Sequence, residues 1–223
     1  MKAVILAAGR GKRMMPLTLT KPKPLLVVMG KTFLDHIFDS FPSTVKEVIV
    51  VIGYKGEQIK MFLGNKYKGK KIHYVIQNKL NGTGPAVQLT KPYFKKKERF
   101  LIVLGDEPVT KKEIKECLSH EFSWLSRRAD IPEQSAVATL AEGNRIIEVI
   151  EKPKHPTSNF VVAGAMVVSA DIFNYQPTKH RTGEYYFTSM MNKFIKDNKV
   201  IAVAGVDNLY FVPGKFDKPS YKG

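Results

Sequence analysis

KAVILAAGRGKR, residues 2–13, is the stretch that decides the fold. Residues 2–7 form a short apolar run that is followed by glycines, which is typical of a buried strand. Gly9 and Gly11 then give the backbone the freedom to approach a ligand closely, and backbone N–H groups in such a turn can bind a phosphate chain. The stretch therefore predicts a strand followed by an anion-binding turn.

The first half of the chain continues with strand-like and helix-like stretches in alternation. Buried strands are expected at residues 2–7, 47–53, 71–77 and 99–105. Helices are expected at residues 31–41, 56–63, within 83–94 and at 110–122. This order is typical of parallel strands joined by crossover helices. We therefore expect an α/β fold with a doubly wound, Rossmann-like, mostly parallel sheet flanked by helices.

The second half is less regular. Strands are expected at residues 134–141, 145–150, 160–169 and 199–206, and a helix is expected at 185–196. No linker separates this half from the first, so we expect a single domain over residues 1–223, with a smaller C-terminal portion from residue 131.

The composition narrows the class of protein. Apolar residues make up 43% of the chain, which argues against disorder, and no apolar run approaches the roughly 20 residues of a membrane span. Glycines and charges interrupt the apolar start at Gly9, so a secretory leader is not expected. The single cysteine, Cys117, excludes an intrachain disulfide and is expected to be a packing residue. We expect a cytoplasmic protein.

The net charge of +16 has three explanations: nucleic-acid binding, attraction of small anionic substrates, or a lysine-rich solvated surface. The lysines are scattered, which favours the solvated surface. No aromatic stacking motif or basic helix supports a nucleic-acid partner, and none is expected.

Polar residues follow the ends of three predicted strands: the turn at 9–13, Gln77 and Asp106. In a parallel sheet, ligands gather beyond the carboxyl ends of the strands. Arg13 offers a bidentate fork for phosphate oxygens, and Lys23 is a point charge between two prolines. These residues predict a binding site at this edge of the sheet.

Over residues 3–26, the string from LAAG through GKRMMPLT to KPKPLL resembles the signature of sugar-1-phosphate nucleotidylyltransferases. It is neither a Walker A loop nor a complete dinucleotide-binding glycine pattern. Shorter segments resemble the same family in the same order: Gln77 with NGTG at 81–84, Gly105-Asp106, Glu151-Lys152-Pro153, Ala163-Gly164, and GEYYFT at 183–188. The resemblance implies transfer of a nucleoside monophosphate from a nucleoside triphosphate to a sugar-1-phosphate, with release of pyrophosphate.

The resemblance also implies residue roles. The catalytic residues would be Arg13, Lys23 and Asp106, with Asp106 as the ligand of Mg²⁺. The nucleotide would be bound by Leu6, Ala7, Ala8, Gly9, Gly11, Arg13, Lys23, Gln77, Gly82 and Thr83. The sugar phosphate would be bound by Gly143, Glu151, Lys152, Gly164 and Glu184. Residues 1–130 would thus bind nucleotide, and residues 131–223 the sugar phosphate.

The expected substrates are UTP, dTTP or GTP together with a sugar-1-phosphate, and the resemblance is compatible with a homo-oligomer. One departure bears on activity. Val212 stands where the family has an aspartate as second magnesium ligand, and valine cannot bind a metal. The alternative is therefore a relative that binds nucleotide or nucleotide sugar without turnover.

Overall fold

The structure, a computed structural model, describes residues 1–206, so Val212 lies outside the described residues. The strands are β1 (Lys2–Ala7), β2 (Val27–Val28), β3 (Lys31–Thr32), β4 (Glu47–Ile52), β5 (Lys66–Tyr67), β6 (Lys70–Ile76), β7 (Arg99–Leu104), β8 (Ser123–Arg128), β9 (Ala136–Ala141), β10 (Arg145–Glu151), β11 (Phe160–Ser169) and β12 (Ile201–Ala204). The helices are α1 (Phe33–Ser40), α2 (Gly56–Leu63), α3 (Thr83–Gln88), α4 (Lys111–Ser119) and α5 (Thr188–Asp197). None of the helices within residues 1–206 has both the length and the apolar character needed to cross a bilayer.

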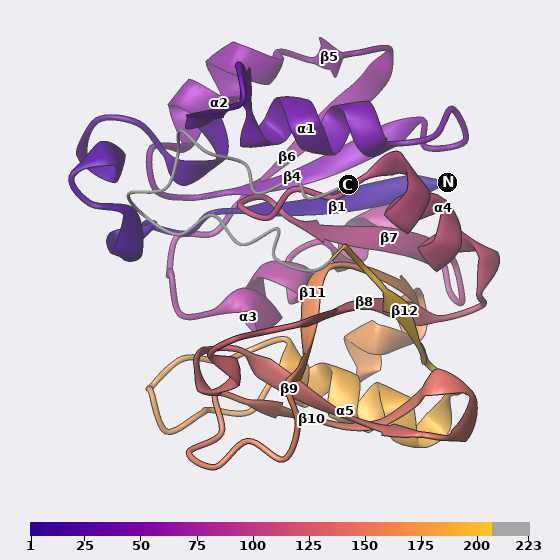
Figure 1. The fold of residues 1–223 in the computed structure, drawn as a ribbon. Helices are drawn as coiled ribbons and strands as arrows, with labels where there is room; N and C mark the ends of the chain where they lie inside the picture. The colour runs from indigo at the N-terminus through magenta and orange to yellow at the C-terminus, as the bar shows by residue number, and fades with distance from the viewer. Residues whose placement is uncertain (207–223) are drawn as a thin grey trace.

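Within residues 1–206, ten strands form one sheet in the order β5-β6-β4-β1-β7-β11-β8-β12-β10-β9 (Figure 1). β1 pairs in parallel with β4 on one side and with β7 on the other. The chain proceeds from β1 outward to β4 and β6, and returns to the other side of β1 at β7. This reversal is the switch point at which open α/β sheets bind ligands.

The expectation of a mostly parallel sheet is wrong for the second half. β11 runs antiparallel to both β7 and β8, and β9 and β10 form an antiparallel hairpin. The hairpin turn at Glu142–Asn144 is too short for a crossover, because parallel neighbours need a connection of about a dozen residues or more. The fold is therefore mixed α/β, with its parallel portion confined mainly to the first half.

Strand β8 was not predicted, and its sequence explains why. SWLSRR has no apolar alternation, yet Ser123, Ser126 and Arg127 are buried together with Trp124 and Leu125. Hydrophobic periodicity cannot detect a strand whose buried positions are polar. Cys117 is buried, as expected.

Capping determines where α1 begins. The Thr32 hydroxyl accepts a hydrogen bond from the Asp35 N–H (3.0 Å), and the Asp35 carboxylate accepts one from the Thr32 N–H (3.1 Å). This capping box starts the helix at Phe33, two residues after the expected boundary. Thr110 caps α4 in the same way, at the first residue of the helix expected at 110–122.

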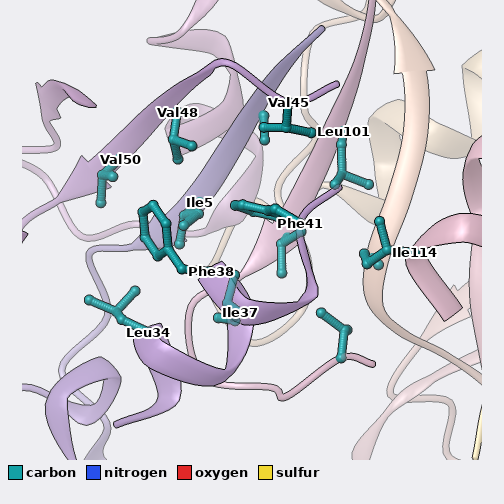
Figure 2. Packing of buried hydrophobic residues seen from close by; sticks show 14 of the residues in the cluster. Ile5, Leu34, Ile37, Phe38, Phe41, Val45, Val48, Val50, Leu101 and Ile114 are labelled. Atoms are coloured by element: carbon teal, nitrogen blue, oxygen red, sulfur yellow. The ribbon is translucent and has the colours of Figure 1, made fainter. Parts of the chain in front are cut away.

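The core has one layer on each face of the sheet. On one face, α1, α2 and α4 cover the odd-numbered residues of β1, including Ile5. Figure 2 shows Phe38 of α1 lying against this face near Val48 and Val50. On the other face, α3 and α5 pack over a second buried cluster. Helices on both faces leave the strand ends as the place where polar residues can gather.

The first prediction tests this packing. Phe38 is buried and makes edge contacts with Phe41 and Tyr67, so Phe38→Ala should lower the free energy of unfolding by about 3–5 kcal/mol. Met61→Ala is the control, because Met61 is 85% exposed and its truncation should change that energy by no more than about 0.5 kcal/mol. Urea unfolding measures both. Equal losses would contradict the assigned packing.

Candidate active site

The turn after β1 is exposed to solvent at Gly9 and packs closely against Thr18 at Gly11. Gly9 is exposed, and a Cβ placed there would meet no atom within 4 Å. Gly11 has a left-handed backbone (φ +61°), and a Cβ there would lie 2.9 Å from Thr18 Cγ2. The Thr18 hydroxyl donates a hydrogen bond to the Gly11 carbonyl (3.0 Å). Glycine is therefore required at Gly11 by conformation and contact, whereas Gly9 leaves space in which a ligand can approach the backbone.

Two of the three predicted catalytic residues are in contact. Lys23 Nζ lies 2.7 Å from Asp106 Oδ2, although the residues are 83 positions apart in the chain. The Lys23 side chain is 18% exposed and that of Asp106 is 40% exposed, so the pair faces solvent on the carboxylate side. Arg13, the third predicted residue, is exposed and forms no hydrogen bond or ion pair with any residue in 1–206.

Glu107, beside Asp106, was missed by the sequence analysis. The residue keeps some exposure, but its carboxyl group is buried and accepts a hydrogen bond from the Gly164 N–H. Burial, and then repulsion from Asp106, raise the pKa of Glu107 to about 7, and Arg127 and Lys23 oppose this rise. A Cβ at Gly164 would lie 2.8 Å from Glu107 Cβ. Gly164 thus makes room for Glu107. The sequence does contain a signal for Glu107, because two adjacent acidic residues, Asp106 and Glu107, directly follow a predicted buried strand.

A buried ion pair supports the loop that carries Asp106. Arg127 Nη2 lies 3.1 Å from Glu113 Oε1, and the two side chains are 1% and 4% exposed. The same Arg127 nitrogen donates to the Pro108 carbonyl (3.2 Å), and Glu113 also accepts the Thr110 N–H in its capping box (2.7 Å). Breaking such a buried pair typically costs about 3–5 kcal/mol, because the remaining charge is left unpaired. The pair thus holds Pro108 and the first turn of α4, the part of the chain that directly follows Asp106 and Glu107.

The predicted base-binding residues lie together beyond β6. Gln77 is buried, and its Nε2 donates to the Gly82 carbonyl (3.0 Å). A carbonyl can only accept, so the amide nitrogen must face Gly82, which leaves Gln77 Oε1 as an acceptor for a ligand. Gly82 has φ +128°, and a Cβ there would lie 2.3 Å from the Tyr185 carbonyl oxygen. Thr83 Oγ1 accepts the Phe187 N–H (2.8 Å).

Glu151 and Lys152 lie at the end of β10. Glu151 Oε2 accepts a hydrogen bond from the buried Thr188 hydroxyl (2.6 Å), and Lys152 Nζ donates to the Tyr186 hydroxyl (2.6 Å). A cavity of about 410 Å³ opens beside Glu151, Tyr186 and Thr188. Carboxylate, hydroxyl and aromatic groups in its wall suit a polyhydroxylated ligand.

The structure does not bring Gly143 to this group. Gly143 lies in the β9–β10 turn, where Arg145 pairs with Ala141, while Glu151 pairs with Ala136 at the other end of the hairpin. Six strand steps of roughly 3.3 Å each separate the two ends. Gly143 and Glu151 therefore lie at opposite ends of the hairpin. Sequence spacing could not show this, because the pairing register decides which end of a hairpin faces the site.

Glu184 is exposed, and its carboxylate forms no hydrogen bond or ion pair within residues 1–206. Its backbone carbonyl accepts the His180 N–H (2.8 Å) and so closes a tight turn at 180–184.

The carboxylate oxygens at this site suit a hard cation whose remaining ligands come from substrate and water. Within residues 1–206 no three His, Cys, Asp or Glu side chains gather into a metal-binding group. Asp106 presents a partly exposed carboxylate with Glu107 beside it. A cation such as Mg²⁺ is commonly bound by one or two carboxylates, with phosphates and water completing its coordination.

Comparison with known proteins establishes the family. Residues 2–204 match the model of the nucleotidyl transferase family, and the chain belongs to this family. The resemblance drawn from residues 3–26 is thereby confirmed.

Curated relatives match most of this chain. The chain is 34% identical over 202 residues to the bifunctional protein GlmU of Methanocaldococcus jannaschii, covering 90% of this chain and 48% of that protein. It is 32% identical over 221 residues to the UTP–glucose-1-phosphate uridylyltransferase AglF of Haloferax volcanii, covering 93% and 88% respectively. The chain thus spans about half the length of the GlmU relatives that it matches.

Solved structures show the same fold. A candidate glucose-1-phosphate thymidylyltransferase of Bacillus anthracis in complex with a sucrose superposes with a TM-score of 0.80 at 25% identity, over 92% of this chain and 87% of the other. A UDP-glucose pyrophosphorylase complexed with UDP-glucose gives a TM-score of 0.76 at 19% identity, over 92% of this chain and 91% of the other.

The second prediction concerns pH. Because the pKa of Glu107 is higher in the folded protein than its ordinary value of 4.5, the folded state binds this proton more tightly than the unfolded state. The protonated Glu107 carboxyl group therefore contributes fully to the stability of the folded state below pH 4.5. This contribution is lost as the pH rises through about 7. Glu107→Gln should therefore stabilise the protein more at pH 8 than at pH 5.

Urea unfolding at both pH values, in metal-free buffer, measures this difference. Glu121→Gln, at an exposed position before β8, is the matched control. A gain for Glu107→Gln that is the same at both pH values would contradict the raised pKa.

Proposed function

We propose that this chain transfers a nucleoside monophosphate from a nucleoside triphosphate to a sugar-1-phosphate, forming a nucleoside-diphosphate sugar and pyrophosphate. The observation that carries the proposal is the contact between Lys23 and Asp106 at the switch point of the sheet, beside the open turn above Gly9. The names of the relatives support it, since AglF is named as a uridylyltransferase acting on glucose-1-phosphate.

The reaction needs positioning and charge rather than a protein nucleophile. An oxygen of the sugar phosphate attacks the α-phosphorus of the triphosphate, and pyrophosphate departs in line from the opposite side. Both reactants are anions, so cationic groups must offset their repulsion and hold them in line.

The nucleotide portion, residues 1–130, supplies most of this charge. Arg13, exposed beside the glycine turn, would bind the triphosphate and the leaving pyrophosphate. Lys23 would lie against the α-phosphate, and Asp106 would hold Mg²⁺. When bound, this ion neutralises charge on the phosphate oxygens. The backbone of Leu6, Ala7, Ala8, Gly9 and Gly11 would line the phosphate path.

The C-terminal portion would hold the sugar phosphate. Lys152 would contact its phosphate, and Glu151, oriented by Thr188, would accept hydrogen bonds from sugar hydroxyls. Gly164 and Glu107 would form the wall between the two substrates. Glu184 would reach the sugar only at the rim, because it is exposed.

The orientation of Gln77 supports the choice of base. Its free Oε1 can accept from the ring N–H that uracil, thymine and guanine carry on their pairing edge. Cytosine and adenine have an acceptor nitrogen at that position, which would face this oxygen unpaired. We therefore infer that UTP, dTTP or GTP is the substrate.

The third prediction is tested by a substrate matrix. Pyrophosphate release with Mg²⁺ is measured for UTP, dTTP, GTP, CTP and ATP against glucose-, mannose-, galactose- and N-acetylglucosamine-1-phosphate. We expect release with at least one of the first three nucleotides and much less with CTP and ATP, because an unpaired polar group at a base edge is strongly disfavoured. Silence across the matrix, with thermal stabilisation by a nucleotide, would identify a binding protein without turnover.

The fourth prediction isolates Lys23. Lys23→Gln removes the cation beside Asp106 and should lower kcat/KM roughly 10²–10³-fold, the usual effect of losing one group that stabilises transition-state charge. Lys31→Gln is the matched control, because Lys31 forms an exposed ion pair with Asp39 (2.6 Å) and neither residue belongs to the proposed site. Similar activity of the Lys23→Gln variant and the wild type would remove Lys23 from the catalytic group.

A further inference from the structure

Residues 178–187 form a segment that lies across the base-binding loop. The Tyr185 N–H donates to the Asn81 carbonyl (2.8 Å), and the Gly84 N–H donates back to the Tyr185 carbonyl (2.9 Å). The Phe187 N–H donates to Thr83 Oγ1 (2.8 Å). A β-bridge between Lys179 and Tyr185 closes the segment on itself. These bonds fix the segment to the loop that contains Gly82 and Thr83.

The same segment also holds Lys152 at two points. The Tyr186 hydroxyl accepts a hydrogen bond from Lys152 Nζ (2.6 Å), and this nitrogen lies 4.5 Å from the centroid of the Tyr186 ring. At the other end of the residue, Arg181 Nη2 donates to the Lys152 carbonyl (2.7 Å). The backbone and the ammonium group of Lys152 are thus held by neighbouring residues of one segment.

Lys152 has a backbone conformation that depends on support from the residues around it. Its φ of +44° lies in the left-handed region, which is unfavourable for a residue with a side chain. The Lys152 N–H donates to the Ser135 carbonyl (2.9 Å), so the residue is held from the β9 side as well. Such a conformation persists only where the surroundings determine it, and it is commonly found at functional sites.

The ammonium group has capacity left for a ligand. It carries three N–H donors, and Tyr186 takes one of them. Tyr186 itself is held in place by the Thr182 hydroxyl (3.3 Å) and by edge contact with the His180 ring (5.3 Å between centroids). A fixed acceptor on one side of the ammonium directs its remaining donors to the other side.

We infer that Tyr186 is a positioning residue for substrate binding: its hydroxyl and ring aim Lys152 at the phosphate of the sugar-1-phosphate. Arg181 assists by fixing the backbone of Lys152. This inference rests on the proposed function, in which Lys152 contacts that phosphate. Tyr186 need not touch the substrate, because it acts through the lysine.

The fifth prediction follows from removing the hydroxyl alone. Tyr186→Phe keeps the ring but removes the acceptor, and it should raise the KM for the sugar-1-phosphate roughly tenfold, the usual size for a hydrogen bond to a charged group. The KM for the nucleoside triphosphate and the melting temperature should stay unchanged. Tyr74→Phe is the matched control, since it removes a hydroxyl that donates to the Gly64 carbonyl (2.6 Å) near the β5 edge of the sheet. It should change neither KM.

A double-mutant cycle separates positioning from general packing. In a Lys152→Ala background, Tyr186→Phe should have no further effect, because no ammonium remains to be aimed. Additive losses in the double mutant would overturn the inference. Equal rises in both KM values, or a lower melting temperature that accounts for the loss, would overturn it as well.

Binding distinguishes failure of this inference from failure of the proposed function. Titration calorimetry measures the affinity of the full chain for each of the four sugar-1-phosphates, with and without UTP. If turnover is absent but Tyr186→Phe and Lys152→Ala weaken that affinity non-additively, the inference stands and the proposed reaction fails. If the wild type is active but Tyr186→Phe matches it in both KM and affinity, only the inference fails. Absence of binding by the wild type would overturn it.

Discussion

Strand β1 is hydrogen-bonded along both edges, to β4 and to β7, and this central position determines where the site can lie. Parallel strands place their carboxyl ends at one edge, so the turn above Gly9 comes beside the loop that carries Asp106. The contact between Lys23 and Asp106 follows from this arrangement. Loss of the pairing between β1 and β7 would separate the turn from the carboxylate.

Charge buried under the Asp106 loop gives this edge its rigidity. Arg127 and Glu113 are almost fully buried, and together they hold the Pro108 carbonyl and the first turn of α4. The same guanidinium offsets part of the repulsion between Glu107 and Asp106. A buried pair contributes little net stability compared with an apolar pair, but it fixes the geometry of the loop that follows Asp106.

The two portions of the chain are joined where their substrates would meet. Glu107, from the first half, packs on Gly164 of β11, which leaves no space for a larger residue there. Residues 178–187 connect the base loop at 81–84 with Lys152. Both connections link residues distant in the chain, so they act as one structural unit around the proposed reaction.

The sequence by itself determined the elements and motifs that depend on neighbours along the chain. The apolar runs located β1, β4, β6 and β7, the helix expected at 110–122 corresponds to α4, and the ordered motifs identified the family. These signals are local, because burial periodicity and capping act within a few residues. The polar residues expected at strand ends, Gln77 and Asp106, lie there for the same reason.

Only the tertiary structure decided the features that depend on pairing between distant segments. The register of β9 and β10 placed Gly143 away from Glu151, and burial between sheet neighbours made a strand of the polar sequence around Arg127. The partnership of Lys152 with Tyr186 likewise has no signature at fixed spacing. Such contacts arise when strands and loops far apart in the chain come together, and no local pattern of residues specifies them.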